Sequence, residues 1–105
     1  MGNQQLNQAT AQPPAFIKAI DPDTGSERIL DAKTEIRNYL SQGCPMVIVD
    51  LLGARYVSSE LLNFLLLCEM DCQRNGATLK VRDVAPDLLR VFRFAGLNQV
   101  IDFSA

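Results

Sequence analysis

Residues 46–68, MVIVDLLGARYVSSELLNFLLLC, contain two apolar runs separated by a short loop. The first run, MVIVDLL, is continuous and rich in β-branched residues, which predicts a central strand covered on both faces. The second run is rich in leucine and follows Ser58 and Ser59, whose hydroxyls are suited to the start of a helix. A buried strand leading into a buried helix predicts an α/β fold in which helices pack on a sheet.

The residues after this stretch continue the alternation of helix and strand. An Asn-Gly pair ends the leucine-rich helix, and TLKVRDV (78–84) alternates as a half-buried strand. APDLLRVFRFAG (85–96) predicts a third helix, because it has a proline in its first turn and a glycine just past its last turn. Phe94 falls among arginines on this helix, and we expect it to pack on the carboxy-terminal VIDF (100–103).

The residues before the central strand predict a hairpin and a first helix. AFIKAI (15–20) and SERIL (26–30) are typical of two short strands joined by the turn DPDTG, whose spacing does not fit a calcium loop. LDAKTEIRNYLSQG (30–43) predicts an amphipathic helix that Asp31 caps and Gly43 ends. Together the elements predict a mixed β-sheet with helices packed mainly on one face.

The composition indicates one globular domain of 105 residues, 48% of them hydrophobic and 21% charged. Residues 1–14 are rich in Gln and Asn and predict a flexible amino-terminal tail, which leaves residues 15–105 as the domain. The longest apolar run is too short to span a bilayer, and the amino terminus does not resemble a secretory signal. We therefore expect no membrane insertion.

Several function classes are excluded by residues that are missing. The net charge of −2, with basic residues spread among acidic ones, argues against nucleic acid as a partner. The chain has no histidine, which removes Ser-His catalysis and His-ligated metal sites. No glycine-rich phosphate loop is present, so a small nucleotide-binding or thiol enzyme is only a rival hypothesis. We expect no enzyme activity and no cofactor.

The three cysteines and Asp50 are predicted to have structural roles. Three cysteines, an odd number, favour free thiols in a reducing, cytoplasmic compartment. Cys68 and Cys72 share the most apolar face of their helix with Leu61 and Leu65, which predicts buried thiols and no metal site. Asp50 ends the central strand, and we expect its carboxylate to accept a hydrogen bond from the following loop.

The segment VIVDLLGARYVSSELL (47–62) resembles the STAS domain of anti-sigma factor antagonists and sulfate-transporter tails. That domain has an apolar strand ending in Asp, a short loop, and D-S-S-G-L opening a helix. RILDA and NGATLKVRDVAPDLLRVFRFAGLNQVIDF also resemble the family, so the resemblance covers residues 28–103. It implies a STAS-like α/β fold and a non-enzymatic protein that binds other proteins.

The resemblance also implies a bacterial regulatory function and a modification site. In such antagonists the first motif serine, here Ser58, is phosphorylated by a partner serine kinase, which is itself an anti-sigma factor. The unmodified protein sequesters that partner and frees a sigma factor for transcription, and a phosphatase restores the unmodified form. Ser59 is the second choice of acceptor. Val57 and Glu60 replace the Asp and Gly of the motif, which leaves an alternative: a STAS subunit that docks on a membrane transporter or signalling complex without phosphate.

The leucine-rich helix has more apolar residues than one buried face requires. A helical wheel places Glu60, Asn63, Asp71 and Arg74 outward with Leu67 among them. We therefore predict one partner-binding surface at the serine-bearing end of this helix. Its members are Ser58, Ser59, Glu60, Asn63, Leu66, Leu67 and Met70. An ordinary leucine-rich helix with one or two exposed apolar residues is the alternative.

Overall fold

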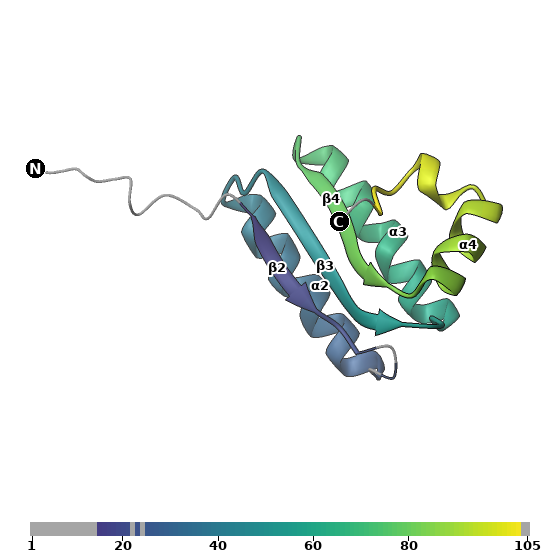
Figure 1. Cartoon of the computed structure of the whole chain (residues 1–105). Helices are drawn as coiled ribbons and strands as arrows, with labels where there is room; N and C mark the ends of the chain where they lie inside the picture. Colours follow the sequence, from purple (N-terminus) through teal and green to yellow (C-terminus); the bar gives the residue numbers. More distant parts are fainter. Residues whose placement is uncertain (1–14, 22, 24, 104–105) are drawn as a thin grey trace, which may run out of the picture.

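The computed structural model describes residues 15–21, 23 and 25–103, so the predicted tail (1–14) lies outside the described residues. A three-stranded sheet carries α2 and α3 on one face, and α4 lies to one side (Figure 1). The described elements are β2 (Phe16–Ala19), α2 (Ser26–Ser41), β3 (Met46–Ala54), α3 (Ser59–Arg74), β4 (Thr78–Val84), α4 (Pro86–Phe94) and the 3-10 helix η2 (Leu97–Gln99). This arrangement confirms the predicted α/β class with helices mainly on one face.

The apolar run MVIVDLL forms β3, the central strand in the order β2-β3-β4. Val47 and Val49 are fully buried towards the helices, whereas Ile48 between them is half-buried on the opposite face. That opposite face of the described sheet carries no described helix (Figure 1). The expectation that helices cover β3 on both faces is therefore wrong for the described residues. The run is continuously apolar because Val47 and Val49 fill the helix-covered face while Ile48 occupies the opposite face of the sheet.

The predicted hairpin is also wrong. β2 pairs with β3 in parallel, with Phe16 opposite Val47, and the described strand pairings are all parallel. SERIL is not a strand but the first turns of α2, which begins at Ser26 after Gly25. The apolar period of Ile29, Ala32, Ile36 and Leu40, all buried, extends the helix upstream of Asp31, so Asp31 is an interior residue and not a cap.

Two contacts hold β2 against α2. The rings of Phe16 and Tyr39 stack with centroids 4.0 Å apart. Two residues further along β2, the Lys18 ammonium donates to the Glu35 carboxylate at 2.8 Å. Helix α2 is therefore joined to β2 at two positions, Phe16 and Lys18.

The carboxy-terminal third confirms most of the predicted pattern. β4 spans Thr78–Val84 as expected, and α4 begins at Pro86 and is followed by Gly96 in the left-handed region at φ 80°. The segment after α4 forms η2 and then an isolated parallel bridge between Lys80 and Asp102. Phe94 does not pack on this segment, since it is 97% exposed. Phe92 instead stacks on Phe103 at 4.9 Å, because Phe92 lies on the core side of α4.

Candidate functional site

The start of α3 is built around Ser58. Its backbone is extended at φ −74° and ψ 162°, and its Oγ accepts a hydrogen bond from the Leu61 N–H at 3.0 Å. Its carbonyl oxygen accepts the first helical bond, from the Leu62 N–H at 3.0 Å. This is the predicted helix cap. Both Ser58 and Ser59 are exposed, so a capped but accessible hydroxyl marks this end of the helix.

The loop before α3 is held by Asp50. One carboxylate oxygen accepts from the Leu52 N–H at 2.8 Å, and the other accepts from Arg82 Nε on β4 at 3.0 Å. The hydrogen bond from Leu52, aided by Arg82, lowers the pKa of Asp50. Leu52 and Gly53 both have positive φ, 56° and 75°, where the pairing of β3 with β4 shifts register. The carboxylate thus fixes a tight turn, which confirms the structural role expected of Asp50.

A second bond ties this loop to the segment after β2. The Tyr56 hydroxyl donates to the carboxylate of Asp23, and this bond raises the pKa of Tyr56. Both side chains are exposed. The loop that carries the serines is therefore joined to both neighbouring strands or their extensions, through Asp50–Arg82 and Tyr56–Asp23.

Six of the seven residues predicted as one surface lie, beyond Ser58, in two groups that share Asn63. Glu60, Asn63 and Leu67 line a hollow of about 280 Å³ between α2 and α3. Ser59, Asn63, Leu66 and Met70, spaced four, three and four residues apart, follow the outer side of α3. We call these four residues the α3 ridge.

Exposure differs along the α3 ridge. Ser59 and Asn63 are exposed, and Met70 is 48% exposed. Leu66 is half-buried and packs against the core. Leu67, expected in the middle of the outward stripe, is also half-buried because it faces the hollow beside α2. The ridge is therefore polar near Ser58 and apolar further along.

The hollow between the helices includes an exposed apolar residue outside the predicted surface. Leu30 on α2 is 61% exposed and lines the hollow with Ser26, Ile29, Lys33 and Phe64. It was missed because residues 26–30 were assigned to a strand. The signal that would have found it is the apolar helical period that already begins at Ile29.

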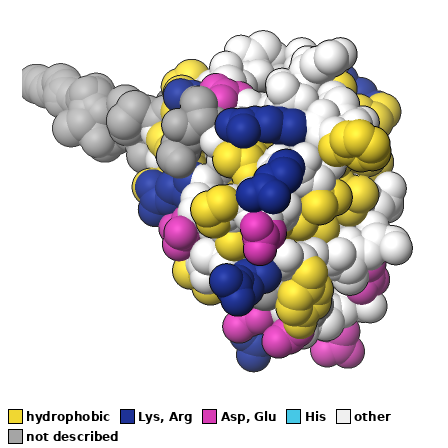
Figure 2. All heavy atoms as spheres, turned by 45° about the vertical axis from the view of Figure 1, so that its right-hand side comes forward, with side chains coloured by type: hydrophobic (Ala, Val, Ile, Leu, Met, Phe, Trp, Pro, Cys, Tyr) yellow, Lys and Arg dark blue, Asp and Glu magenta, His cyan; other side chains and the backbone are white. Residues whose placement is uncertain are grey.

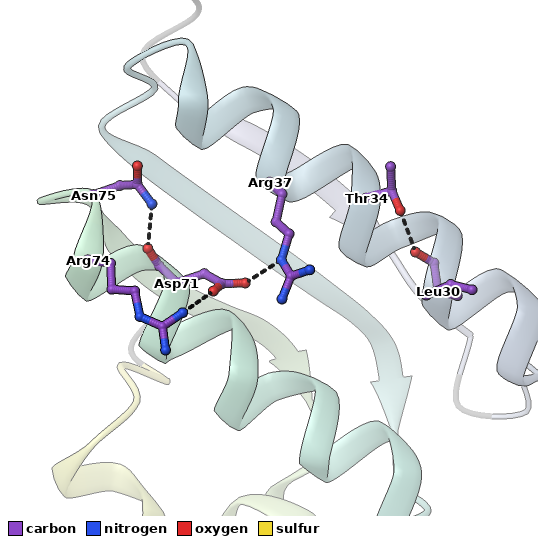
Figure 3. A network of polar contacts seen from close by, with 6 residues as sticks. All are labelled: Leu30, Thr34, Arg37, Asp71, Arg74 and Asn75. Atoms are coloured by element: carbon purple, nitrogen blue, oxygen red, sulfur yellow. Dashed lines mark hydrogen bonds and ion pairs between the residues drawn. The ribbon is translucent and has the colours of Figure 1, made fainter.

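An ionic network clamps α2 to the far end of α3 (Figure 3). The Asp71 carboxylate accepts from Arg37 Nε on α2 at 3.1 Å and from an Arg74 guanidinium nitrogen at 3.2 Å. Its backbone oxygen accepts from the Asn75 amide at 2.8 Å. Asp71 is buried, so its predicted outward position is wrong, because the wheel did not account for α2 covering that side of α3.

The thiols are buried as predicted. Cys68 and Cys72 are fully buried, and burial raises the pKa of each to about 12. Cys44 is also buried, and its Sγ donates to the Met46 carbonyl at 3.2 Å. Across the part of the chain that the structure describes, no group of three or more His, Cys, Asp or Glu side chains is placed to hold a metal ion. Within the same residues, no helix is both long and apolar enough to cross a membrane.

Comparison with known families gives one match. The family described as "Mlab, STAS domain" matches residues 25–102, from the start of α2 to the bridge with β4. No curated protein matches the chain. The matched range contains Ser58, the α3 ridge and the hollow between α2 and α3.

Proposed function

The chain belongs to the STAS family, and from this membership we propose that it is a regulatory protein-binding module that sequesters an anti-sigma factor of the serine-kinase type. STAS domains are generally binding modules and not enzymes. By holding the anti-sigma factor, the protein would free a sigma factor for transcription. The proposed compartment is the bacterial cytoplasm, where this partner acts.

The observation that carries the proposal is the capped, exposed hydroxyl of Ser58 at the start of α3. Its position is fixed by the bond from Leu61 and by the loop that Asp50 holds. A hydroxyl placed this rigidly on an accessible helix end gives a partner a defined polar contact. The α3 ridge supports the proposal. It starts at Ser59, beside Ser58, and towards the carboxy-terminal end of α3 it carries Met70, an exposed apolar side chain.

Ser58 is the proposed phosphorylation site, with Ser59 as the second choice. A phosphate on Ser58 would add about 1.5 to 2 negative charges at the positive end of the helix dipole. Phosphate oxygens are strong acceptors, so the backbone N–H of Leu61 would keep a partner and the fold would survive. A partner packed against this helix end would instead meet a bulky dianion, which would break the complex without unfolding the domain.

A second candidate function is a STAS subunit that docks on a membrane transporter or a signalling complex without phosphate. The observation that favours it is the pair of residues beside Ser58. Val57 stands where the motif has an acid, so no carboxylate at this position orients the Ser58 hydroxyl, and the valine side chain packs against the core instead. Glu60 lies in the first turn of α3, where its carboxylate would repel the phosphate of ATP and of phosphoserine. Both candidate functions use the same surface, and they differ in whether Ser58 is phosphorylated.

Mixing the protein with its candidate anti-sigma kinase, with and without ATP, tests the proposal. Complex formation is followed by isothermal titration calorimetry, and modification is followed by intact mass. The antagonist function predicts binding without ATP, and with ATP it predicts one added phosphate on Ser58 with loss of the complex. Binding that persists with no added phosphate would leave a pure binding module that is not switched at Ser58, and absence of binding contradicts the antagonist function.

Two matched variants test the surface. Met70→Glu places a charge on the α3 ridge, and Ile17→Glu places the same charge on β2 at a residue of nearly equal exposure, 48% against 50%. We expect Met70→Glu to weaken binding at least about tenfold and Ile17→Glu to leave it unchanged. Equal affinities for the two variants would exclude the ridge from the interface.

A further inference from the structure

The turn between α3 and β4 contains an Asn-Gly pair that the proposed function does not use. Asn75 follows the last residue of α3, and Gly76 has a φ of 67°, in the left-handed region that favours glycine. Both residues are exposed, and a Cβ added at Gly76 would meet no described atom within 4 Å. The pair Asn75–Gly76 is therefore an open turn that solvent reaches.

An asparagine followed by glycine can deamidate without an enzyme. The glycine nitrogen, after losing its proton to hydroxide, attacks the asparagine Cγ, and the side-chain nitrogen takes up a proton and leaves as ammonia. The product is a five-membered succinimide ring, which water opens to aspartate or isoaspartate. Glycine is the most favourable following residue because it has no side chain to hinder this attack. Each of the other asparagines in the chain is followed by Gln, Tyr or Phe, so Asn75 is the candidate.

The folded turn holds the reacting atoms apart. A ψ of 8° at Asn75 places the Gly76 nitrogen next to the backbone nitrogen of Asn75, whereas the ring requires it next to the Asn75 Cβ. The Asn75 amide donates to the Asp71 carbonyl oxygen at 2.8 Å (Figure 3). The Gly76 N–H donates to the Gln73 carbonyl oxygen at 3.2 Å. Ring closure therefore requires both bonds to break and the ψ of Asn75 to rotate.

Only the last turn of α3 has to open for this rotation. The N–H groups of Asn75 and Ala77 both donate to the Cys72 carbonyl oxygen, at 3.1 and 2.8 Å, and these bonds close the turn. Helix ends open with free energies well below that of global unfolding. Cys72 is fully buried below the turn, so we expect the opening to stop there. The ring can therefore close in a protein whose core remains folded.

We propose that Asn75 deamidates in the folded protein, at a rate set by the opening of the last turn of α3, and that the product loosens this end of the helix. The Asp71 carbonyl holds the Asn75 amide. The Asp71 carboxylate in turn contacts Arg37 and Arg74, which fixes Asp71 against α2. The network that joins α2 to α3 therefore slows the reaction. The proposal involves neither Ser58 nor the α3 ridge, so it stands or fails separately from the proposed function.

Deamidation would remove one contact and add one repulsion at the end of α3. A carboxylate at residue 75 cannot donate a hydrogen bond, so the Asp71 carbonyl oxygen loses its side-chain donor. The carboxylate also places a negative charge at the negative end of the helix dipole, one helical turn from the Asp71 carboxylate. In isoaspartate the main chain is longer by one carbon as well, which distorts the turn. Both products therefore weaken the end of α3 that contacts α2.

The new charge would act mainly on its nearest neighbours. One deamidation adds a single negative charge to a chain whose net charge is −2. On the face that Figure 2 shows, basic, acidic and apolar side chains are interspersed. Charges on such a surface are largely screened beyond about 8 Å at physiological ionic strength. We therefore expect a local loss of stability and no change at Ser58, which lies at the other end of α3.

Ageing of the full chain is the first test. The protein is kept for several weeks in mildly alkaline buffer, folded or in urea, and each asparagine is followed by tandem mass spectrometry. The folded protein should gain one mass unit at Asn75 and at no other asparagine, and the reaction in urea should be at least about tenfold faster. If Asn75 reacts in urea but not in the folded protein, or equally fast in both, the proposal is overturned.

Two variants of Asn75 form the second test. Asn75→Gln keeps an amide but would need a larger ring, so it should show no gain of mass at this residue. Asn75→Asp imitates the product and should raise the unfolding equilibrium constant about five- to tenfold in urea titrations. Asn63→Asp, which adds the same charge to the amino-terminal half of α3, is the matched control and should stay within about twofold of wild type. Equal stability of Asn75→Asp and wild type would overturn the proposed loosening of α3.

Discussion

The Oγ of Ser58 accepts a hydrogen bond from the backbone N–H of Leu61 at 3.0 Å, across the first turn of α3. The same hydroxyl is exposed to solvent. Ser58 therefore stabilises the helix and is also the accessible group proposed to contact a partner. The two roles are separable, because the cap requires only an oxygen acceptor whereas a partner also responds to charge and size.

Changing Ser58 tests the cap. Ser58→Ala should lower the free energy of unfolding by about 1 kcal/mol because the Leu61 N–H loses its acceptor. Ser58→Asp should stay within about 0.5 kcal/mol of wild type, because a carboxylate caps as well as a hydroxyl. Urea unfolding measures both. Ser59→Ala is the control, since Ser59 is the first residue inside the helix, and an equal loss for Ser58→Ala and Ser59→Ala would contradict the cap.

The Asp50 carboxylate should make stability depend on pH. Its pKa is lowered from the ordinary value of 3.8 in the folded state, so its ionised form stabilises the fold above that value. This stabilisation is lost as the pH falls through the lowered pKa. Asp50→Asn should therefore cost about 2 kcal/mol at neutral pH, and the difference from wild type should shrink in acid. A difference that stays constant from neutral pH into strong acid would contradict this assignment.

The contact between Arg37 and Asp71 should couple α2 to α3. A double-mutant cycle with Arg37→Gln and Asp71→Asn should give a coupling energy of about 0.5 to 1 kcal/mol, limited because Arg37 is more than half exposed. Asp71→Asn alone should cost more than Arg37→Gln, because the buried carboxylate also accepts from Arg74. The exposed pair Asp87–Arg90 is the control and should couple less. Strictly additive effects of Arg37→Gln and Asp71→Asn would show that the contact does not hold the helices together.

The cysteines should be unreactive while the protein is folded. With a pKa of about 12, only about one part in 10⁴ of each Cys68 or Cys72 thiol is ionised at pH 8, and both are buried. A chromogenic disulfide reagent should therefore label them only as fast as the protein unfolds, and rapidly in urea. Stoichiometric labelling of the folded protein within minutes would contradict their burial.

Local patterns were sufficient to predict β3, α3, β4 and α4, because each of these segments has either a continuous apolar run or one dominant period, and clear ends. The stretch around α2 was predicted wrongly for a physical reason. DPDTG has strong turn chemistry, and SERIL is too short to show whether its apolar residues follow a strand or a helix. The parallel pairing of β2 with β3 is a tertiary contact, so no local signal distinguished it from a hairpin.

In the candidate site, too, local interactions could be predicted from the sequence and tertiary contacts could not. The cap at Ser58 is a local interaction and could be predicted from the residue type and its place before the leucine run. The burial of Asp71 and of Leu67 depends on where α2 lies beside α3, which a helical wheel of α3 alone does not contain. Phe94 was expected to pack on the carboxy-terminal VIDF, and only the structure shows that Phe92 takes that place against Phe103.

The affinity of Ser58→Asp for the anti-sigma kinase, relative to wild type and Ser58→Ala, tests the central claim most directly. The claim is that the unmodified protein binds a partner through the Ser58 end of α3, a surface that both candidate functions use. Calorimetry should show Ser58→Asp binding at least about tenfold more weakly than wild type while its unfolding free energy is unchanged, and Ser58→Ala binding within about threefold. Binding of Ser58→Asp with wild-type affinity would contradict the claim.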